Sequence, residues 1–238
     1  MYLFTNKELS EWVRENVSFE ERYDYLAQFD KFRVLNEAQI ENTDSFDIFL
    51  SHSYKDRDLV LGIKAVFEKL GYSVYIDWIN DRLLSREKVT KDTASVLQKR
   101  MRQSKSLIYV TSESSSHSKW MPWEAGFFDG IRDRMIAILP ITDEEQSEKP
   151  FIGQEYLGLY PYLALDSLDK NFINKPMFME PTAFESMLNQ YRSSYKLFVF
   201  RDYQSYVLFE NWINGEKPLS RLEIMNETLD KLNKLRNK

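Results

Sequence analysis

Between residues 47 and 139, short apolar runs alternate four times with amphipathic stretches, and this alternation constrains the fold more than any other feature. The runs at 47–50, 73–76, 107–110 and 135–139 are too short for helices and predict buried strands. Their residues show no inside–outside alternation, which is typical of strands buried on both faces. Strands that alternate with helices predict a parallel sheet covered by helices. We therefore expect an α/β fold with five parallel strands, the fifth over 162–165.

Three residues mark boundaries within this region. Apolar residues at helical spacing run from Leu59 to Leu70, and Gly71 predicts the end of that helix. Asp56 precedes the same helix and is interpreted as its N-cap. Pro140 lacks a backbone N–H and is expected to stop the fourth strand.

The chain divides into three predicted parts: a helical N-terminal extension at 1–43, an α/β domain at 44–166 and a mostly helical C-terminal extension at 167–238. Thr5 is the candidate cap of the first N-terminal helix. The N-terminal apolar stripes need a partner surface, so we expect this segment to pack on the α/β domain. The stripes contain Leu9, Trp12, Val13, Tyr23, Leu26 and Phe29.

Three helices are predicted in the C-terminal extension, at 181–193, 203–213 and 220–235. The last has the clearest start signal. Ser220 and Glu223 stand three residues apart, as in a capping box, where each side chain bonds the backbone N–H of the other residue.

Polar and aromatic side chains follow the carboxyl ends of three predicted strands. Parallel sheets bind ligands at this rim, so these residues predict a site there. They are His52 and Ser53 after the first strand, Asp77 and Trp78 after the second, and Trp120 and Glu124 beyond the third. The last two belong to a helix that Pro122 marks near its start, with Phe127, Phe128 and Ile131 on the same predicted face.

Each of these residues also has a plainer interpretation. Glu124 can be an ordinary acid in the first turn of a helix, where it interacts favourably with the helix dipole. Trp120 is equally compatible with core packing. Asp77, at the end of a strand, can simply cap the following loop.

Composition excludes several classes of function. The chain has no cysteine and two histidines, which leaves no thiol nucleophile, no disulfide and no histidine-rich metal site. A net charge of −5 creates no field that would attract nucleic acid or an anionic membrane. The basic cluster Lys99, Arg100, Arg102 and Lys105 is interpreted as a solvated helix face. No run is long enough to span a bilayer and no signal peptide is evident, so a cytoplasmic protein is expected.

Three blocks of the sequence together resemble a TIR (Toll/interleukin-1 receptor) domain. Asp47-Ile48-Phe49-Leu50-Ser51-His52-Ser53 is similar to the first strand and loop of that family, and residues 71–77 to its second strand. Ser118-Lys119-Trp120 followed by Glu124 is similar to the signature of its third helix. The resemblance covers about residues 45–166. The sequence looks most like bacterial TIR proteins, some of which serve antiphage defence of the Thoeris type. Met121 stands where many relatives have cysteine.

The resemblance implies a flavodoxin-like fold and, in catalytic members, cleavage of the nicotinamide–ribose bond of NAD+. Glu124 takes the position of the catalytic glutamate, and the other five rim residues are expected to bind the substrate. The products implied are nicotinamide with ADP-ribose or a cyclic or derived ADP-ribose signal that acts on a downstream effector. No cofactor is expected, and the absence of G-x-G-x-x-G and of a P-loop indicates that NAD+ is a substrate.

A second function remains open at this stage, that of a non-catalytic TIR adaptor acting through protein contacts. The resemblance also implies self-association, for which the loop from Asp77 to Lys88 is the candidate surface. It holds apolar residues among charged ones, namely Trp78, Ile79, Leu83 and Leu84. Packing of these side chains onto their own domain is the alternative.

Overall fold

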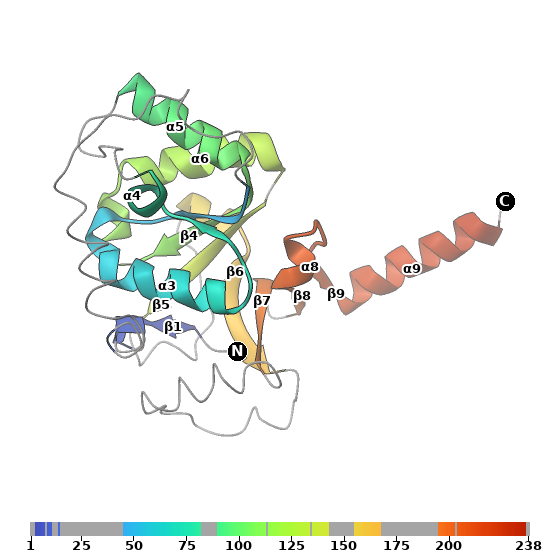
Figure 1. Cartoon of the computed structure of the whole chain (residues 1–238). Coiled ribbons are helices and arrows are strands. Elements are labelled where there is room, and N and C mark those ends of the chain that lie inside the picture. Colours follow the sequence, from blue (N-terminus) through green and yellow to red (C-terminus); the bar gives the residue numbers. More distant parts are fainter. Residues whose placement is uncertain are drawn as a thin grey trace.

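The computed structural model describes residues 3–7, 9, 10, 14, 45–81, 90–112, 114–133, 135–142, 155–167, 195–202 and 204–236. Five parallel strands form the centre of its sheet, in the order β3-β2-β4-β5-β6 (Figure 1). They are β2 (Phe46–Ser51), β3 (Val74–Tyr75), β4 (Ser104–Thr111), β5 (Ile136–Thr142) and β6 (Tyr162–Ser167). The predicted α/β fold with five parallel strands is confirmed, and its strand order is that of flavodoxin-like sheets.

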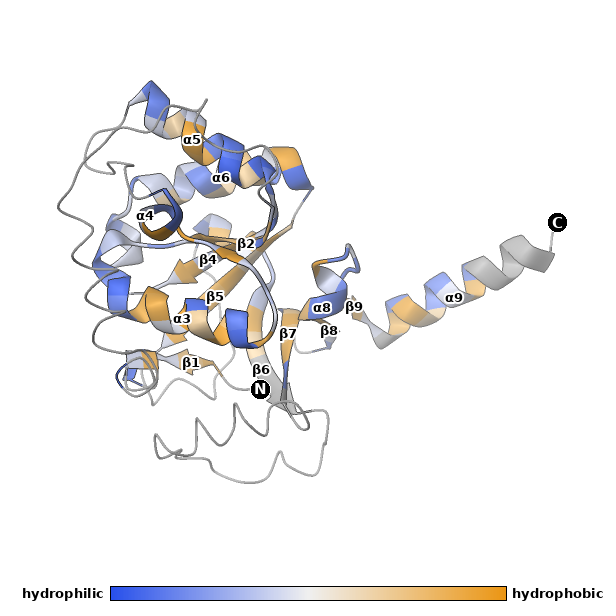
Figure 2. Ribbon diagram, in the orientation of Figure 1, coloured by the Kyte–Doolittle hydropathy of each residue, from blue (hydrophilic) through white to orange (hydrophobic). Residues whose placement is uncertain are grey.

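Helices cover both faces of the sheet and enclose two apolar clusters (Figures 1 and 2). Helix α3 (Arg57–Lys69) buries Ile63 and Phe67 in the cluster on one face. Helices α5 (Lys91–Arg102) and α6 (Trp120–Arg132) bury Leu97 and Phe128 in the cluster on the other. The strands are orange through the middle of Figure 2, because central parallel strands are apolar on both sides.

Pro140 does not stop the fourth strand as predicted, since β5 continues to Thr142. The pairing of β5 explains the difference. Pro140 lies opposite Thr111, the last residue of β4, so the ladder between these two strands ends there. A missing N–H is tolerated at the end of a ladder, and beyond it Ile141 and Thr142 pair with another strand.

That other strand is β1 (Phe4–Thr5), which pairs in parallel with the end of β5. Thr5 therefore lies in a strand and is buried, whereas the sequence predicted a helix cap; helical residues begin at Asn6. Leu9 is fully buried in the cluster beside α3. The described part of the N-terminal extension thus packs on the α/β domain. Trp12, Val13, Tyr23, Leu26 and Phe29 lie outside the described residues.

The C-terminal extension adds three antiparallel strands to the edge of the sheet after β6. They are β7 (Tyr195–Asp202), β8 (Ser205–Leu208) and β9 (Leu219–Ser220), with a short helix α8 (Phe209–Trp212) between the last two. The predicted helix at 203–213 is wrong over β8, because Ser205–Leu208 completes a hairpin with β7. Helix α9 (Arg221–Arg236) confirms the helix predicted at 220–235, while 181–193 lies outside the described residues.

A buried ion pair holds the segment that follows β3. Helix α4 (Asp77–Asn80) is followed by its C-cap Asp81, whose carboxylate accepts bonds from Arg100 Nε at 2.9 Å and Arg100 Nη2 at 2.7 Å. The hydroxyl of Tyr75 donates to the same carboxylate at 2.7 Å. Arg100 is only 6% exposed, so the prediction of a solvated basic face is wrong at this residue. A bidentate partner and two aromatic rings, those of Phe46 and Tyr75, make its burial possible.

Candidate active site

Glu124 lies in the second turn of α6, on the side that faces the sheet. The helix starts at Trp120, with Pro122 in the first turn as predicted, and the Met121 N–H donates to Ser118 Oγ at 3.3 Å. Buried residues of α6 follow the helical repeat, and they are Met121, Glu124, Ala125 and Phe128. Ile131, predicted on this face, is instead 37% exposed. Glu124 has no exposed surface, so a simple solvated first-turn acid does not describe it.

Ser51 holds the carboxylate of Glu124. It is the last residue of β2, and its Oγ donates to Glu124 Oε2 at 2.6 Å. Hydrogen bonds to a charged group at this distance are short and strong. The bond joins the sheet rim to α6 across 73 positions of sequence, which is why the sequence alone did not single out Ser51.

Tyr109 is the neighbour of Ser51 in the sheet. The two residues are paired in the β2–β4 ladder, so their side chains lie on the same face, the one covered by α6. The Tyr109 hydroxyl lies 3.5 Å from that of Tyr156, in the turn Glu155–Leu159. Burial, the Tyr156 hydroxyl and the negative charge of Glu124 all raise the pKa of Tyr109. Tyr109 therefore remains a neutral hydroxyl beside the Glu124 carboxylate. The sequence alone did not point to Tyr109, because only the register of β2 against β4 places it beside Ser51.

His52 and Trp78 form a second group at the same rim. His52 Nδ1 lies 2.8 Å from the Leu50 carbonyl oxygen, and the indole N–H of Trp78 donates to His52 Nε2 at 2.9 Å. An indole can only donate, so Nε2 is an acceptor and His52 is the neutral tautomer protonated on Nδ1. Asp77 Oδ1 lies 3.7 Å from the same Nε2. All three side chains are buried, with exposed fractions of 0%, 7% and 2% for His52, Trp78 and Asp77.

The two groups lie on opposite faces of the sheet. Trp78 belongs to the cluster beside α3, whereas Tyr109 and Met121 belong to the cluster beside α5 and α6. They meet at the end of β2, where Ser51 and His52 are consecutive residues. The structure therefore brings His52, Trp78 and Asp77 together, whereas Glu124 contacts Ser51, which was not predicted as a site residue.

Serine hydroxyls tie together the loops at this rim. Ser53, which is 5% exposed, accepts a bond from the Lys55 N–H, and Asp56 follows in the same turn. Asp56 takes the N-cap position of α3, as predicted, but its side chain makes no cap bond there. Its Oδ2 accepts from the hydroxyls of Ser112 and Ser114, the latter at 2.7 Å. The loop after β2 and the loop after β4 are thus held together by Asp56.

Trp120 lies at the start of α6, half-buried and in edge-to-face contact with Trp123, with ring centroids 5.3 Å apart. Trp123 in turn stacks on Phe127 at 5.9 Å. These three rings flank the turn that carries Glu124 and leave part of Trp120 accessible. Across the ranges that the structure describes, no group of three potential ligand side chains is arranged to bind a metal ion. Within the same ranges, no helix has the length and apolarity needed to cross a bilayer.

Comparison with known proteins identifies the family to which this fold and site belong. Residues 48–172 match the TIR domain family. The chain is 38% identical over 215 residues to the probable 3′ cyclic ADP-D-ribose synthase ThsB′ of Bacillus cereus, covering 90% of this chain and 98% of that protein. It is 31% identical over 144 residues to the putative cyclic ADP-D-ribose synthase TIR2 of Cytobacillus dafuensis, covering 60% of this chain and 36% of that protein. The chain therefore belongs to the TIR domain family.

Proposed function

We propose that this protein cleaves the nicotinamide–ribose bond of NAD+ and closes the ADP-ribosyl group into a cyclic ADP-ribose that serves as an antiphage immune signal. The observation that carries the proposal is the buried Glu124 carboxylate, held by Ser51 at the rim where parallel sheets bind ligands. The two relatives, both named as cyclic ADP-D-ribose synthases, support the choice of product. By likeness to the first, the 3′ cyclic isomer is expected.

The chemistry needs little more than a well-placed carboxylate. Nicotinamide in NAD+ is a cationic leaving group and departs with the electron pair of the C–N bond, without a proton from an acid. Positive charge then develops on the ribose, as in glycoside cleavage. A carboxylate in a buried site stabilises that charge far better than one in water, because the surroundings screen it less. Glu124 is the proposed source of this stabilisation.

The fate of the ribosyl group depends on what attacks it. A hydroxyl of the same molecule gives a cyclic product, whereas water gives ADP-ribose. In both cases the attacking oxygen forms the new C–O bond and releases one proton. The Tyr109 side chain lies beside Ser51 and is only 3% exposed, so it excludes water from that side of the Glu124 site. Exclusion of water favours attack by the substrate's own hydroxyl.

Binding of NAD+ requires movement at the rim. Glu124 and His52 have no exposed surface in this conformation, so the ribose reaches Glu124 only when neighbouring side chains shift. Trp120 is partly accessible, lies one helical turn before Glu124 and is proposed to contact the substrate. Ser53, Asp77, His52 and Trp78 are proposed to border the dinucleotide. NAD+ is the substrate in this scheme and no cofactor is invoked.

Self-association through the loop from Asp77 to Lys88 is a further part of the proposal. Trp78 is 7% exposed and Ile79 packs against the core cluster, so these two side chains are directed at their own domain. The remaining candidates, Leu83 and Leu84, lie outside the described residues. Replacement of both by Asp is expected to lower nicotinamide release per protomer at high protein concentration. Equal activity in that variant across a dilution series contradicts this role.

Product analysis tests the proposal. Purified protein is incubated with NAD+, alone and with lysate of phage-infected cells, and nicotinamide, ADP-ribose and cyclic isomers are separated by chromatography and identified by mass spectrometry. Equal amounts of nicotinamide and a cyclic ADP-ribose support it. Nicotinamide with only linear ADP-ribose shows a glycohydrolase. Absence of nicotinamide under both conditions favours the adaptor function.

A further inference from the structure

A row of side chains crosses the sheet beneath α6 and starts at Ser51, the residue that holds Glu124. Ser51 of β2 pairs with Tyr109 of β4. Tyr109 pairs in turn with Ile138 of β5, and Ile138 pairs with Tyr162 of β6. Paired residues of neighbouring strands point to the same face of a sheet, and the last three lie in the cluster beside α5 and α6. Tyr109 is therefore the sheet residue next to the Glu124 site on the side of β4.

The turn Glu155–Leu159 reaches this row from the surface. Tyr156 in this turn is 38% exposed, whereas Tyr109 is 3% exposed, and their hydroxyls lie 3.5 Å apart. Burial, the Tyr156 hydroxyl and the charge of Glu124 all raise the pKa of Tyr109, which shows that the three groups are close together. Tyr156 therefore lies between the Tyr109 hydroxyl and solvent, at the edge of the Glu124 site.

The turn is held more firmly at its other end. Tyr160 follows the turn, and its hydroxyl donates to Asp129 Oδ2 at 3.2 Å. Asp129 belongs to α6, the helix that also carries Glu124. A hydrogen bond to a carboxylate is stronger than one between two neutral hydroxyls, and 3.5 Å is long for an O–H···O bond. The contact between Tyr156 and Tyr109 is thus the weaker one, and it can open while Tyr160 keeps the turn attached to α6.

Water must be kept from the ribosyl group after nicotinamide has left, if a cyclic product is to form. Tyr109 excludes water on its own side of the site, but its hydroxyl is protected from solvent only as long as Tyr156 covers it. The same cover has to move when NAD+ enters, because Glu124 has no exposed surface in this conformation. Tyr156 meets both requirements, since it is partly exposed and loosely held.

We propose that Tyr156 is a specificity-determining residue that sets the ratio of cyclic to linear product. It parts from Tyr109 to admit NAD+ and returns to that contact, so that water is excluded while the ribosyl group closes. This role rests on the proposed function. With Tyr156 in place, a hydroxyl of the substrate forms the new C–O bond. With Tyr156 displaced, water forms that bond and the product is ADP-ribose. The attacking oxygen loses its proton to solvent in both cases.

Product ratios in matched variants test this role. The variants are Tyr156→Ala, Tyr156→Phe, Tyr109→Phe and the double Phe variant. The control is Tyr206→Ala, because Tyr206 is also an exposed tyrosine, at 44%, but lies on β8, separated from β4 by β5, β6 and β7. Nicotinamide, cyclic product and ADP-ribose are quantified for each protein under conditions in which the natural chain is active, and melting temperatures are compared.

Tyr156→Ala is expected to raise the ratio of linear to cyclic product by at least about 10-fold, while nicotinamide release changes by less than about 3-fold. Each single Phe variant removes one partner of the same contact, so each is expected to shift the ratio by about 2- to 5-fold, and the double variant by no more than a single one. Tyr206→Ala is expected to keep the natural ratio.

A natural ratio in Tyr156→Ala overturns the role of Tyr156 and leaves the proposed function standing. Effects of the two Phe substitutions that multiply in the double variant overturn the contact with Tyr109. An equal shift in Tyr206→Ala also overturns the role, because it assigns the change to general loosening of the fold. A natural chain that makes no cyclic product overturns the proposed function and this role together.

Discussion

At the scale of single residues, the proposed catalysis depends on how the Glu124 side chain is held. The side chain is inaccessible and shares a 2.6 Å hydrogen bond with Ser51 Oγ. A carboxylate that keeps its orientation before the substrate arrives need not reorganise when charge develops on the ribose. Ser51 is therefore expected to be a positioning residue, one that acts on the reaction through Glu124.

Replacement of Ser51 by Ala tests that role. A hydrogen bond to a charged group contributes about 1.5–3 kcal/mol, so its loss is expected to lower kcat for nicotinamide release by about 10- to 100-fold. The KM for NAD+ is expected to change little. Ser106→Ala is the matched control, because Ser106 is also a buried strand serine but its hydroxyl bonds the Asp47 carbonyl. An equal loss in both variants assigns the effect to general destabilisation.

Residues differed in how well the sequence predicted them. Glu124 was predicted from its motif, and the structure shows that its side chain is fully buried. Ser51 and Tyr109 were missed because their closeness follows from the β2–β4 register, which no local pattern reveals. Arg100 was placed on the surface because its neighbours Lys99 and Arg102 are polar, yet a carboxylate 19 positions away makes it a core residue.

At the scale of elements, the Arg100–Asp81 pair links α5 to the end of α4, which carries Trp78. Arg100→Met removes one charge and leaves the other buried, so the free energy of unfolding is expected to fall by about 3–5 kcal/mol. Arg102→Met, at an exposed position of the same helix, is expected to cost less than about 1 kcal/mol. Urea unfolding of both variants measures the difference. Equal values refute a structural role for the pair.

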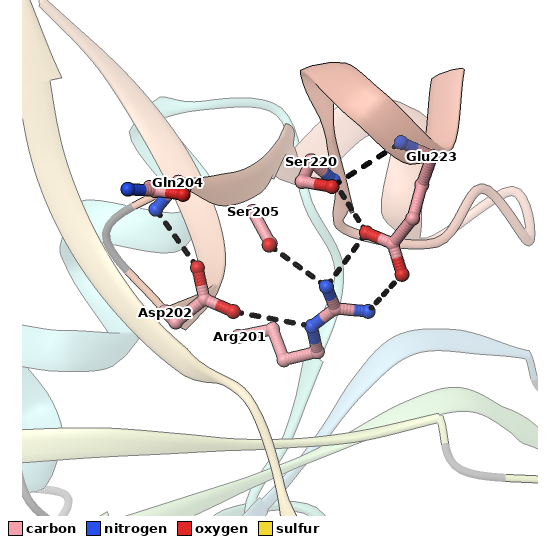
Figure 3. A network of polar contacts seen from close by, with 6 residues as sticks. All are labelled: Arg201, Asp202, Gln204, Ser205, Ser220 and Glu223. Carbon is pink, nitrogen blue, oxygen red and sulfur yellow. Dashed lines mark hydrogen bonds and ion pairs between the residues drawn. The ribbon is translucent and has the colours of Figure 1, made fainter. Parts of the chain in front are cut away.

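Arg201, Ser220 and Glu223 form a clamp of hydrogen bonds at the start of α9, and this clamp has a defined pH dependence (Figure 3). The bonds from Arg201, and then those from Ser220, lower the pKa of Glu223 from 4.5 to about 2. A lowered carboxyl pKa means that the clamp contributes fully to stability above pH 4.5 and loses that contribution as pH falls toward 2. Side-chain NMR is expected to show Glu223 titrating near pH 2, with Arg201→Ala moving the midpoint toward 4.5. A midpoint near 4.5 in the natural chain disproves the clamp.

At the scale of the whole molecule, both extensions are joined to the sheet. β1 pairs with β5, and the C-terminal strands continue the sheet from β6, where Tyr162 stacks on Phe200 with centroids 5.6 Å apart. Phe209 of α8 packs on Phe67 of α3. The described parts of the chain thus belong to one sheet and the helices that cover it, with the candidate site on the parallel half.

The N-terminal packing gives a test at this scale. Leu9 is fully buried in the cluster beside α3, so Leu9→Ala is expected to lower the free energy of unfolding by about 2–5 kcal/mol. Deletion of residues 1–43 is expected to expose apolar surface on the α/β domain and lower its melting temperature or solubility. A truncated protein that melts and dissolves like the full chain shows that the segment is an independent arm.

The parallel core was predictable from sequence because each strand and helix carries its own periodicity. The C-terminal hairpin was not, because Tyr203 to Ile213 has apolar spacing compatible with a helix and only pairing with β7 makes Ser205–Leu208 a strand. The same reasoning applies to Pro140, whose place in β5 depends on where β4 ends. The elements that depend on distant pairing partners were therefore the ones that were predicted wrongly from the sequence.

Nicotinamide release by the natural chain and by Glu124→Gln tests most directly whether Glu124 is needed to cleave NAD+. Gln keeps the shape and can still accept the bond from Ser51, but it removes the charge that stabilises the ribosyl cation. We expect kcat to fall by at least about 100-fold with an unchanged melting temperature. The comparison is made under conditions in which the natural chain releases nicotinamide, with infected lysate if a trigger is needed. Full activity in Glu124→Gln, with unchanged melting behaviour, would remove Glu124 from the mechanism and contradict the account.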